Sequence, residues 1–241
     1  LVELGSGASV KTRLLLDGLP HVSGYVPVDI SREFLSQTAA QLAADYPNLP
    51  VMPVVGDFMA AILLPDLGGR SVVGFFPGST LGNLDPDGAV SLLARLRAWP
   101  DHAALILGVD LVKAPALLEA AYDDTQGVTA AFNLNLLVRL NREAGADFDL
   151  AAFRHRAVWN ASASRVEMHL ESLRAQEVRI AGRTIAFAAG ETIHTENSHK
   201  FTTESLAAMA AAAGWHVADV LTDPEALFAV AILRPSPSAA A

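Results

Sequence analysis

The stretch LVELGSGAS at residues 1–9 decides the fold, because it joins a short apolar run to two closely spaced glycines. The next residues, KTRLLLDGL at 11–19, carry leucines at helical spacing, so the sequence predicts a strand, a glycine turn and a helix. In an open α/β sheet such a turn lies at the carboxyl edge of the strands, where ligands bind. Glycine also lets the backbone approach a ligand closely. Taken alone, the motif is also compatible with a tight turn that binds nothing.

Four more apolar runs predict further strands of the same sheet. They span residues 25–30, 51–55, 71–76 and 103–109. Their residues are β-branched or continuously apolar rather than alternating, as in parallel strands that are buried on both faces. Helical stretches lie between them, one running from an N-cap at Ser31 to about Tyr46 and another at 87–99. The alternation predicts an α/β fold with right-handed crossovers.

The pattern changes after about residue 115. Short alternating runs then predict an antiparallel unit, in which AGR at 181–183 forms a hairpin turn. These runs lie at residues 165–173, 176–180 and 184–188. A helix-like stretch lies around 116–122, and the segment at 132–142 has apolar residues at mixed spacing.

The C-terminal part returns to the first pattern. An Ala-rich helix at 201–213 ends before Gly214, a residue type favoured after a helix, and two apolar runs predict the last strands. These runs lie at 215–221 and 228–233. We therefore expect two domains. The first is formed by residues 1–115 and 200–241, and the second is an α+β insert at 116–199.

Composition excludes several classes of protein. Of 241 residues, 51% are hydrophobic and 18% are charged, which supports a sizeable core and argues against disorder. The net charge of −9, with scattered basic residues, argues against a nucleic-acid partner. The absence of cysteine excludes disulfides, a thiolate nucleophile and a cysteine-bound zinc. No apolar run reaches the length of about 18 residues that a membrane span needs, which excludes such a span. We expect a cytoplasmic monomer without a membrane partner.

Carboxylates follow two of the predicted strands. Asp29 lies 24 residues after Gly5, a spacing at which a carboxylate accepts hydrogen bonds from both hydroxyls of a ribose. Asp57 and Phe58, after the third strand, suit the amino group and the flat face of an adenine. A dinucleotide and S-adenosylmethionine (SAM) both contain these groups. The single short glycine turn favours SAM, and the closing helix and strands fit a class I methyltransferase; a nicotinamide oxidoreductase stays as a distant alternative.

Longer motifs make this prediction specific. They read ELGSGASVKTR, YVPVDIS, GDF, FFPGSTLGN, AYDDTQGVTAAFNLNLL, NREAGADFDLAAFRH, RVEMHL and ETIHTENSHKF. Over essentially its whole length the chain resembles the histidine N-alpha-methyltransferase family, which trimethylates histidine to the betaine hercynine on the way to ergothioneine. The resemblance implies a Rossmann-like class I methyltransferase with an inserted α+β substrate-binding unit. It also implies SAM as methyl donor, S-adenosyl-L-homocysteine as product, L-histidine as substrate and no metal.

The resemblance places the methyl donor on five residues. They are Gly5, Lys11, Asp29, Asp57 and Phe58. Lys11 lies in the first turns of the predicted helix, where its point charge can reach the carboxylate of the donor. Without the resemblance, Lys11 reads as a solvated helix residue.

The resemblance places histidine on six further residues. They are Gly78, Asn83, Tyr122, Met168, Glu196 and Ser198. Asn83 and Tyr122 are implied at the carboxylate and amine, with Gly78 lining the loop; an amide and a phenol satisfy a zwitterion without adding charge. Glu196 and Ser198 are implied at the imidazole, and on an extended segment two such residues point the same way. Met168 is implied beside the ring, although Met168 and Tyr122 could also be packing residues. No general base is evident, so positioning is expected to carry catalysis.

Three expectations stay open at this point. A related aromatic amino acid such as tryptophan is an alternative substrate, against which Glu196, Ser198 and Met168 argue. His194 and His199 invite a zinc site, but we expect none because no third ligand lies nearby in the sequence. The chain begins inside its first strand without a methionine, whereas members of the family carry a helical segment there. We therefore expect further residues before Leu1 in the natural protein, or else a reduced, SAM-binding but catalytically incomplete module.

Overall fold

The structure is a computed structural model that describes residues 1–7 and 9–237. The chain divides into two compact units, unit 1 formed by Leu1–Leu111 with Phe201–Ala241 and unit 2 formed by Val112–Lys200. The sequence predicts an insert at 116–199, and the role of this insert in substrate binding stays a prediction. Among the described residues, no helix has the length and apolar character needed to cross a membrane.

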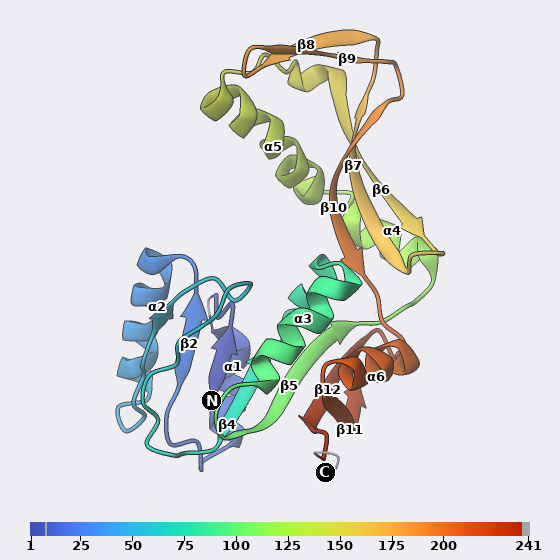
Figure 1. Ribbon diagram of the computed structural model, residues 1–241. Coiled ribbons are helices and arrows are strands. Elements are labelled where there is room, and N and C mark those ends of the chain that lie inside the picture. The colour runs from blue at the N-terminus through green and yellow to red at the C-terminus, as the bar shows by residue number, and fades with distance from the viewer. Residues whose placement is uncertain (8, 238–241) are drawn as a thin grey trace. The chain divides into compact units, whose positions relative to one another are not determined.

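Unit 1 is built on a seven-stranded sheet. Its strands are β1 (Val2–Leu4), β2 (Val26–Asp29), β3 (Val54–Val55), β4 (Val72–Phe76), β5 (His102–Asp110), β11 (Trp215–Thr222) and β12 (Phe228–Pro235). They lie in the order β11-β12-β5-β4-β1-β2-β3 (Figure 1). The first five strands pair in parallel, and β12 runs antiparallel to both β5 and β11. The predicted parallel sheet with two closing strands is therefore present.

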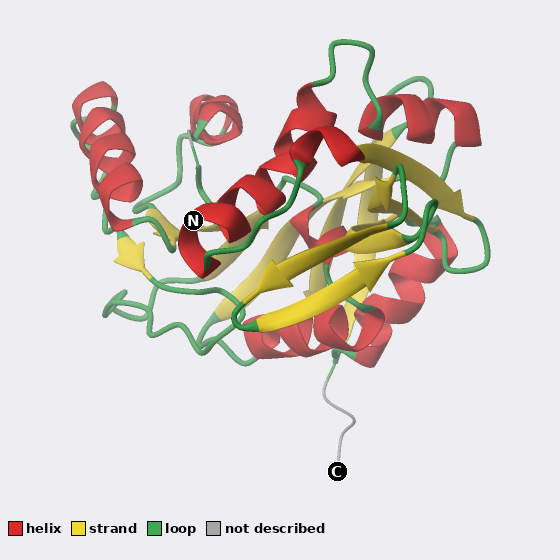
Figure 2. Ribbon diagram, turned by 90° about the horizontal axis from the view of Figure 1, so that it is seen from above, coloured by secondary structure: helices red, strands yellow, loops and turns green. Residues whose placement is uncertain are grey.

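Among its described residues, unit 1 also contains four α-helices and one 3-10 helix. They are α1 (Val10–Gly18), α2 (Arg32–Asp45), η1 (Thr80–Asn83), α3 (Pro86–Arg97) and α6 (Thr203–Ala212). Figure 2 shows helices, in red, on either side of this sheet. Strands such as β5 are apolar at successive positions, and successive side chains point to opposite faces of the sheet. Both faces of the sheet therefore contribute side chains to the core. Ser31 precedes α2 as predicted, but its side chain makes no capping hydrogen bond.

Two local features shape the edge of the sheet that carries the glycine loop. β3 is shorter than the predicted run at 51–55, because Pro53 lacks an N–H group and Val51 forms only an isolated bridge with Tyr25. On β5, a Cβ atom added to Gly108 would lie 2.2 Å from the carbonyl oxygen of Pro77. Only glycine therefore allows the loop after β4 to pass over β5 at this distance.

Unit 2 contains two antiparallel sheets and two α-helices (Figure 1). The elements are α4 (Pro115–Tyr122), α5 (Val128–Ala144), η2 (Leu150–Ala152), β6 (Phe153–Asn160), β7 (Arg165–Ser172), β8 (Gln176–Ile180), β9 (Arg183–Phe187) and β10 (Thr192–His199). The larger sheet has the order β10-β7-β6, and β8 pairs with β9. Ala181 and Gly182 join β8 to β9 with φ of 48° and 75°, as a two-residue hairpin turn requires. The predicted hairpin is confirmed.

Helix α5 covers the stretch at 132–142, to which the sequence assigned no element. Its apolar residues show mixed spacing because they lie on both sides of the helix: Leu137 is buried, whereas Phe132 is 65% exposed. Asp124 caps the helix by accepting hydrogen bonds from the backbone N–H groups of Val128 and Thr129. These bonds lower the pKa of Asp124 to about 2, and the bond from the Thr129 backbone N–H has the largest effect.

Candidate functional site

The glycine loop of unit 1 borders a cavity of about 210 Å³. The cavity is lined by three residues for which the resemblance implies a role in ligand binding, namely Gly5, Lys11 and Gly78. The rest of its lining comes from Glu3, Leu4, Ser6, Ser9, Val10, Pro77 and Thr80. The cavity therefore lies at the carboxyl ends of β1 and β4, the edge at which parallel sheets of this kind bind ligands.

Asp29 is tied to the glycine loop at the carboxyl end of β2. Its Oδ2 accepts a hydrogen bond from the Gly7 N–H at 3.3 Å, and its Oδ1 accepts one from the Ser31 N–H at 2.9 Å. The N–H groups of Gly5 and Ser6 both donate to the carbonyl oxygen of Val28. The loop is thereby fixed next to a carboxylate that retains free lone-pair directions for a ribose diol.

Gly5 and Phe58 lie close together, and Asp57 is exposed. Gly5 has a φ of 61°, and a Cβ atom there would lie 3.7 Å from Cε1 of Phe58, whose ring meets Phe76 edge-on. Asp57 is exposed, and its Oδ1 accepts a hydrogen bond from the Met59 N–H at 2.8 Å. Asp29, Asp57 and Phe58 are all absent from the lining of the cavity described above. Their contacts with the donor stay predictions.

Two polar residues of this cavity were not singled out from the sequence. Glu3 is only 2% exposed, and its Oε2 accepts hydrogen bonds from the hydroxyls of Thr12 and Tyr25. Burial raises the pKa of Glu3, against the effect of these two hydrogen bonds. Ser6 Oγ is buried and, within the part of the chain that the structure describes, has no hydrogen-bond partner. A charged residue inside the apolar run LVEL was the available signal for Glu3.

This set of groups fits SAM. The Asp29 carboxylate suits the ribose hydroxyls, the Lys11 ammonium suits the donor's carboxylate, and the buried Ser6 hydroxyl lacks the partner that a ligand would supply. Gly5 keeps the wall of the cavity free of a side chain. The residues thus offer hydrogen bonds to both polar ends of the donor.

In unit 2 the structure brings together Tyr122 and Ser198, which are 76 residues apart in sequence. Tyr122 ends helix α4, which packs against β6 and β7, and its Oη lies 2.7 Å from Oγ of Ser198 on β10. Lys200 donates to both oxygens from its Nζ atom. The sequence analysis did not single out Lys200, since a lysine after a strand ordinarily reads as a surface residue.

Met168 and Glu196 are paired across neighbouring strands. They lie opposite each other on β7 and β10, beyond a bulge at Thr195 whose hydroxyl donates to the Met168 carbonyl oxygen. Ser198 follows Glu196 by two residues and therefore projects from the same face of β10. Burial raises the pKa of Glu196. A carboxylate, a hydroxyl and a thioether thus lie on one face of the sheet.

A network of buried hydrogen bonds ends at the backbone carbonyl of Tyr122. The Asn133 side-chain NH₂ donates to Nδ1 of His155 at 2.9 Å and to the carbonyl oxygen of His169 at 3.2 Å. Because Nδ1 accepts, the proton of the neutral ring lies on Nε2, which donates to the carbonyl oxygen of Tyr122 at 2.7 Å. The network fixes the C-terminal end of α4, and with it the start of the Tyr122 side chain.

We expect Asn133→Ala to destabilise the protein by about 2 kcal/mol, because it leaves buried partners unpaired at His155 and His169. Chemical denaturation followed by circular dichroism measures this change. Asn135→Ala is the matched control, because Asn135 lies exposed on the same helix. Equal stability of the two variants would show that the buried network contributes nothing.

Gly78 and Asn83 belong to unit 1, whereas the other predicted substrate residues belong to unit 2. Gly78 lines the cavity at the glycine loop, and Asn83 is exposed at the end of η1. Ser79, between them in sequence, anchors this loop by accepting a hydrogen bond from the Asp110 N–H at 2.9 Å. The roles of Gly78 and Asn83 stay predictions.

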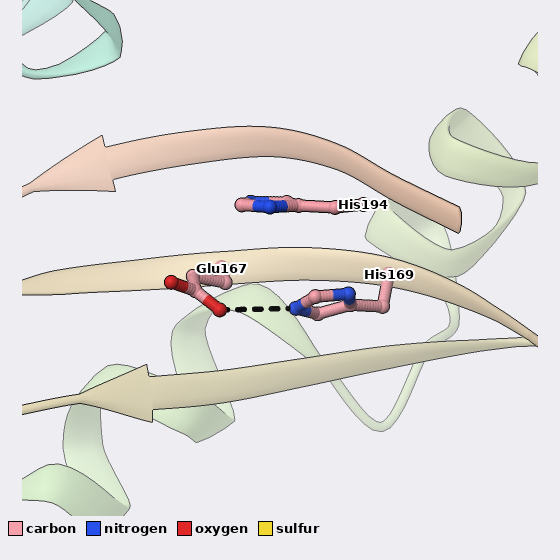
Figure 3. Close-up of side chains that lie close together, drawn as sticks. All are labelled: Glu167, His169 and His194. Carbon is pink, nitrogen blue, oxygen red and sulfur yellow. Dashed lines mark hydrogen bonds and ion pairs between the residues drawn. The ribbon is translucent and has the colours of Figure 1, made fainter. Parts of the chain in front are cut away.

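One cluster of possible metal ligands occurs among the described residues, and it differs from the one weighed in the sequence. It consists of Glu167, His169 and His194, whose ligand atoms lie within 4.8 Å of one another (Figure 3). The structure thus places two possible ligand groups beside His194 that are distant from it in the sequence, and its histidine neighbour is His169 rather than His199. The two rings are stacked, with centroids 4.6 Å apart and planes 25° apart. Their in-plane lone pairs run side by side instead of converging on one ion.

Glu167 is also engaged elsewhere. Its Oε1 accepts hydrogen bonds from Arg165 and Asn160, and its Oε2 lies 3.2 Å from Nε2 of His169. Burial raises the pKa of Glu167, but the hydrogen bonds from Arg165, Asn160 and His169 outweigh it and hold the pKa at about 2. The cluster is accounted for as a hydrogen-bonded part of the β7–β10 surface.

Comparison with known proteins identifies the family. A family model described as "Histidine-specific methyltransferase, SAM-dependent" matches residues 1–235. The chain is 43% identical to a histidine N-alpha-methyltransferase of Mycolicibacterium smegmatis, over 96% of this chain and 74% of that protein. It is 44% identical to a histidine N-alpha-methyltransferase of Mycobacterium tuberculosis, over 90% of this chain and 69% of that protein.

The fold is that of known methyltransferases. The solved structure of the CcbJ methyltransferase from Streptomyces caelestis matches 98% of this chain and 83% of that chain with a TM-score of 0.53. At 18% sequence identity this likeness shows the fold alone, and it confirms the predicted Rossmann-like class. The family match confirms SAM as the methyl donor. The chain is a methyltransferase and belongs to the SAM-dependent, histidine-specific methyltransferase family.

Proposed function

We propose that this enzyme methylates the α-amine of L-histidine three times in succession and releases the trimethyl betaine, hercynine, as a step of ergothioneine biosynthesis. The observation that carries the substrate assignment is the arrangement on β10, where Glu196 and Ser198 project from one face and Tyr122 meets Ser198. A carboxylate acceptor and a hydroxyl donor on one face suit the two nitrogens of an imidazole. The names of the two mycobacterial relatives support the α-amine as the methylated atom.

The chain's contribution to the reaction is positioning. SAM, when bound, supplies a methyl group that its sulfonium already activates. Asp29 and Lys11 hold the two polar ends of the donor, and Glu196, Ser198 and Tyr122 orient histidine so that its amine lone pair can attack in line. Holding two reactants in attack geometry contributes on the order of 7 kcal/mol or more in favourable cases.

Three transfers follow from the chemistry of the amine. Each of the first two leaves an ammonium that must lose a proton to water before its lone pair can attack again. The third yields a quaternary ammonium without a proton or lone pair, so the sequence ends there. Tyr122 and Asn83, an uncharged phenol and an uncharged amide, are proposed to hold the amine and carboxylate of histidine throughout. Neutral groups do not stabilise the charged, unreactive form of the amine as a carboxylate would.

We expect the chain to bind histidine in calorimetric titrations with saturating S-adenosylhomocysteine, and to give mono-, di- and trimethylhistidine in sequence by mass spectrometry. Tryptophan and phenylalanine serve as competing substrates in the same assay. Binding of S-adenosylhomocysteine without methylation of histidine would contradict the proposed function while leaving the family assignment intact. Accumulation of monomethylhistidine alone would contradict the trimethylation.

A further inference from the structure

Lys200 is a buried lysine beside the two hydroxyl groups of the proposed histidine pocket. Lys200 is only 3% exposed, although lysine is among the residue types that are least often buried. It follows Ser198 by two residues and Glu196 by four, immediately after β10. Removing a charged group from water is unfavourable unless its hydrogen bonds are made. The position therefore calls for a specific role.

Nζ of Lys200 forms a triangle with the hydroxyl oxygens of Tyr122 and Ser198. Nζ donates to Tyr122 Oη at 2.7 Å and to Ser198 Oγ at 2.9 Å, and the two oxygens lie 2.7 Å apart. Nζ also lies 4.5 Å from the centroid of the Tyr122 ring, within the range of a cation–π interaction. Ser198 is buried as well. The ammonium thus holds both side chains of the pair in place.

The triangle fixes the direction of the hydrogen bonds. An ammonium has donors and no acceptor, so both hydroxyl oxygens must accept from Nζ. The two hydroxyls carry one proton each, and the contact between them uses only one. The remaining proton points out of the triangle, from Ser198 or from Tyr122. Because each oxygen already accepts from Lys200, the pair offers the substrate a donor.

We propose that Lys200 is a positioning residue that makes the Tyr122–Ser198 pair a hydrogen-bond donor, so that the pocket selects neutral histidine with one imidazole lone pair facing this pair and the N–H facing Glu196. The inference rests on the proposed function, since it specifies how that substrate is recognised. Glu196 and Ser198 project from one face of β10, so each meets a different nitrogen of the same ring. Phenylalanine offers neither a lone pair nor an N–H, and its binding leaves both groups unpaired.

The test is a double-mutant cycle on Lys200 and Ser198. We expect Lys200→Met to weaken histidine binding about 10-fold and to lower the preference for histidine over phenylalanine, while affinity for S-adenosylhomocysteine changes less than about 2-fold. Ser198→Ala should weaken histidine binding too, and the double variant should be no weaker than the worse single one, because both changes remove the same donor. Lys200→Arg should restore part of the affinity by returning a cation to the site.

The controls separate this role from a structural one. Arg183→Met removes an exposed cation from β9 in the same unit and should leave histidine binding unchanged. Thermal unfolding checks each variant. If Lys200→Met is unfolded at the assay temperature, Lys200→Gln, which removes the charge and supplies an acceptor oxygen, takes its place in the same cycle, and the coupling to Ser198 decides. If the Lys200 and Ser198 substitutions have additive effects in a folded, active protein, the role assigned to Lys200 is wrong, whereas the proposed function stands. Absence of methylhistidine from the wild-type chain would overturn the proposed function, and the role of Lys200 with it.

Discussion

Asp29→Ala weakens binding of S-adenosylhomocysteine by about 100-fold or more, because hydrogen bonds to a charged group contribute roughly 1.5–3 kcal/mol each and the ribose diol offers two. Asp29 is also an acceptor for the Gly7 and Ser31 N–H groups, so the alanine variant loosens the glycine loop as well. Asp29→Asn keeps one acceptor and removes the charge. We expect a loss of about 10-fold for this variant. Isothermal titration with the wild-type protein as reference measures both changes.

The control is an exposed carboxylate in the same unit. Asp45 forms an ion pair with Arg13 at 2.6 Å, and exposed pairs of this kind contribute little to stability. Asp45→Ala should therefore leave donor binding unchanged. Retention of donor affinity within about 3-fold in Asp29→Ala would show that the carboxylate does not contact the ribose. The adenine contacts expected of Asp57 and Phe58 would then need to carry donor recognition.

The sheet of unit 1 could be predicted because its strands are apolar at successive positions. This pattern is typical of parallel strands buried on both faces, and the glycine turn after β1 marks where the first crossover begins. Helix α5 could not be predicted in the same way. Its apolar residues Phe132 and Leu136 are exposed, so no single buried stripe appears in the sequence. β6 (FRHRAVWN) groups its polar residues together, and β10 (TIHTENSH) has a single apolar residue, so neither strand shows a clear alternation.

The candidate site shows the same division. Gly5 and Asp29 follow from strand-end chemistry, which depends on local order along the chain. The residues proposed to bind histidine could be predicted only through the resemblance, since Tyr122 and Ser198 meet through tertiary packing across 76 residues. The burial of Lys200 and Glu3 could not be predicted, because it depends on tertiary packing. A lone charge at a strand end, or inside an apolar run, marks such residues only weakly in a sequence.

Glu196→Ala should reduce kcat/KM for histidine by about 100-fold or more, because it leaves a buried imidazole N–H without an acceptor. The values for phenylalanine and tryptophan should change little, so the preference for histidine should fall by a similar factor. Competition assays with the three amino acids measure this preference directly. Glu177→Ala is the matched control, because Glu177 is an exposed carboxylate on β8 in the same unit. An unchanged preference in Glu196→Ala would show that another group reads the imidazole.

The pH dependence of histidine binding tests the charge of the same carboxylate. Burial raises the pKa of Glu196 above the ordinary glutamate value of 4.5, so protonation removes this acceptor at a higher pH than for an exposed glutamate. Wild-type affinity for histidine should therefore fall as the pH is lowered toward this raised pKa. The amide oxygen of Glu196→Gln accepts a hydrogen bond at every pH, and the variant retains only the pH dependence that comes from histidine itself. The ratio of the two dissociation constants, wild type over variant, should rise as the pH falls from 7 to 5. A constant ratio would mean that the Glu196 carboxylate does not titrate against histidine binding, and that the contact to the imidazole N–H lies elsewhere in the pocket.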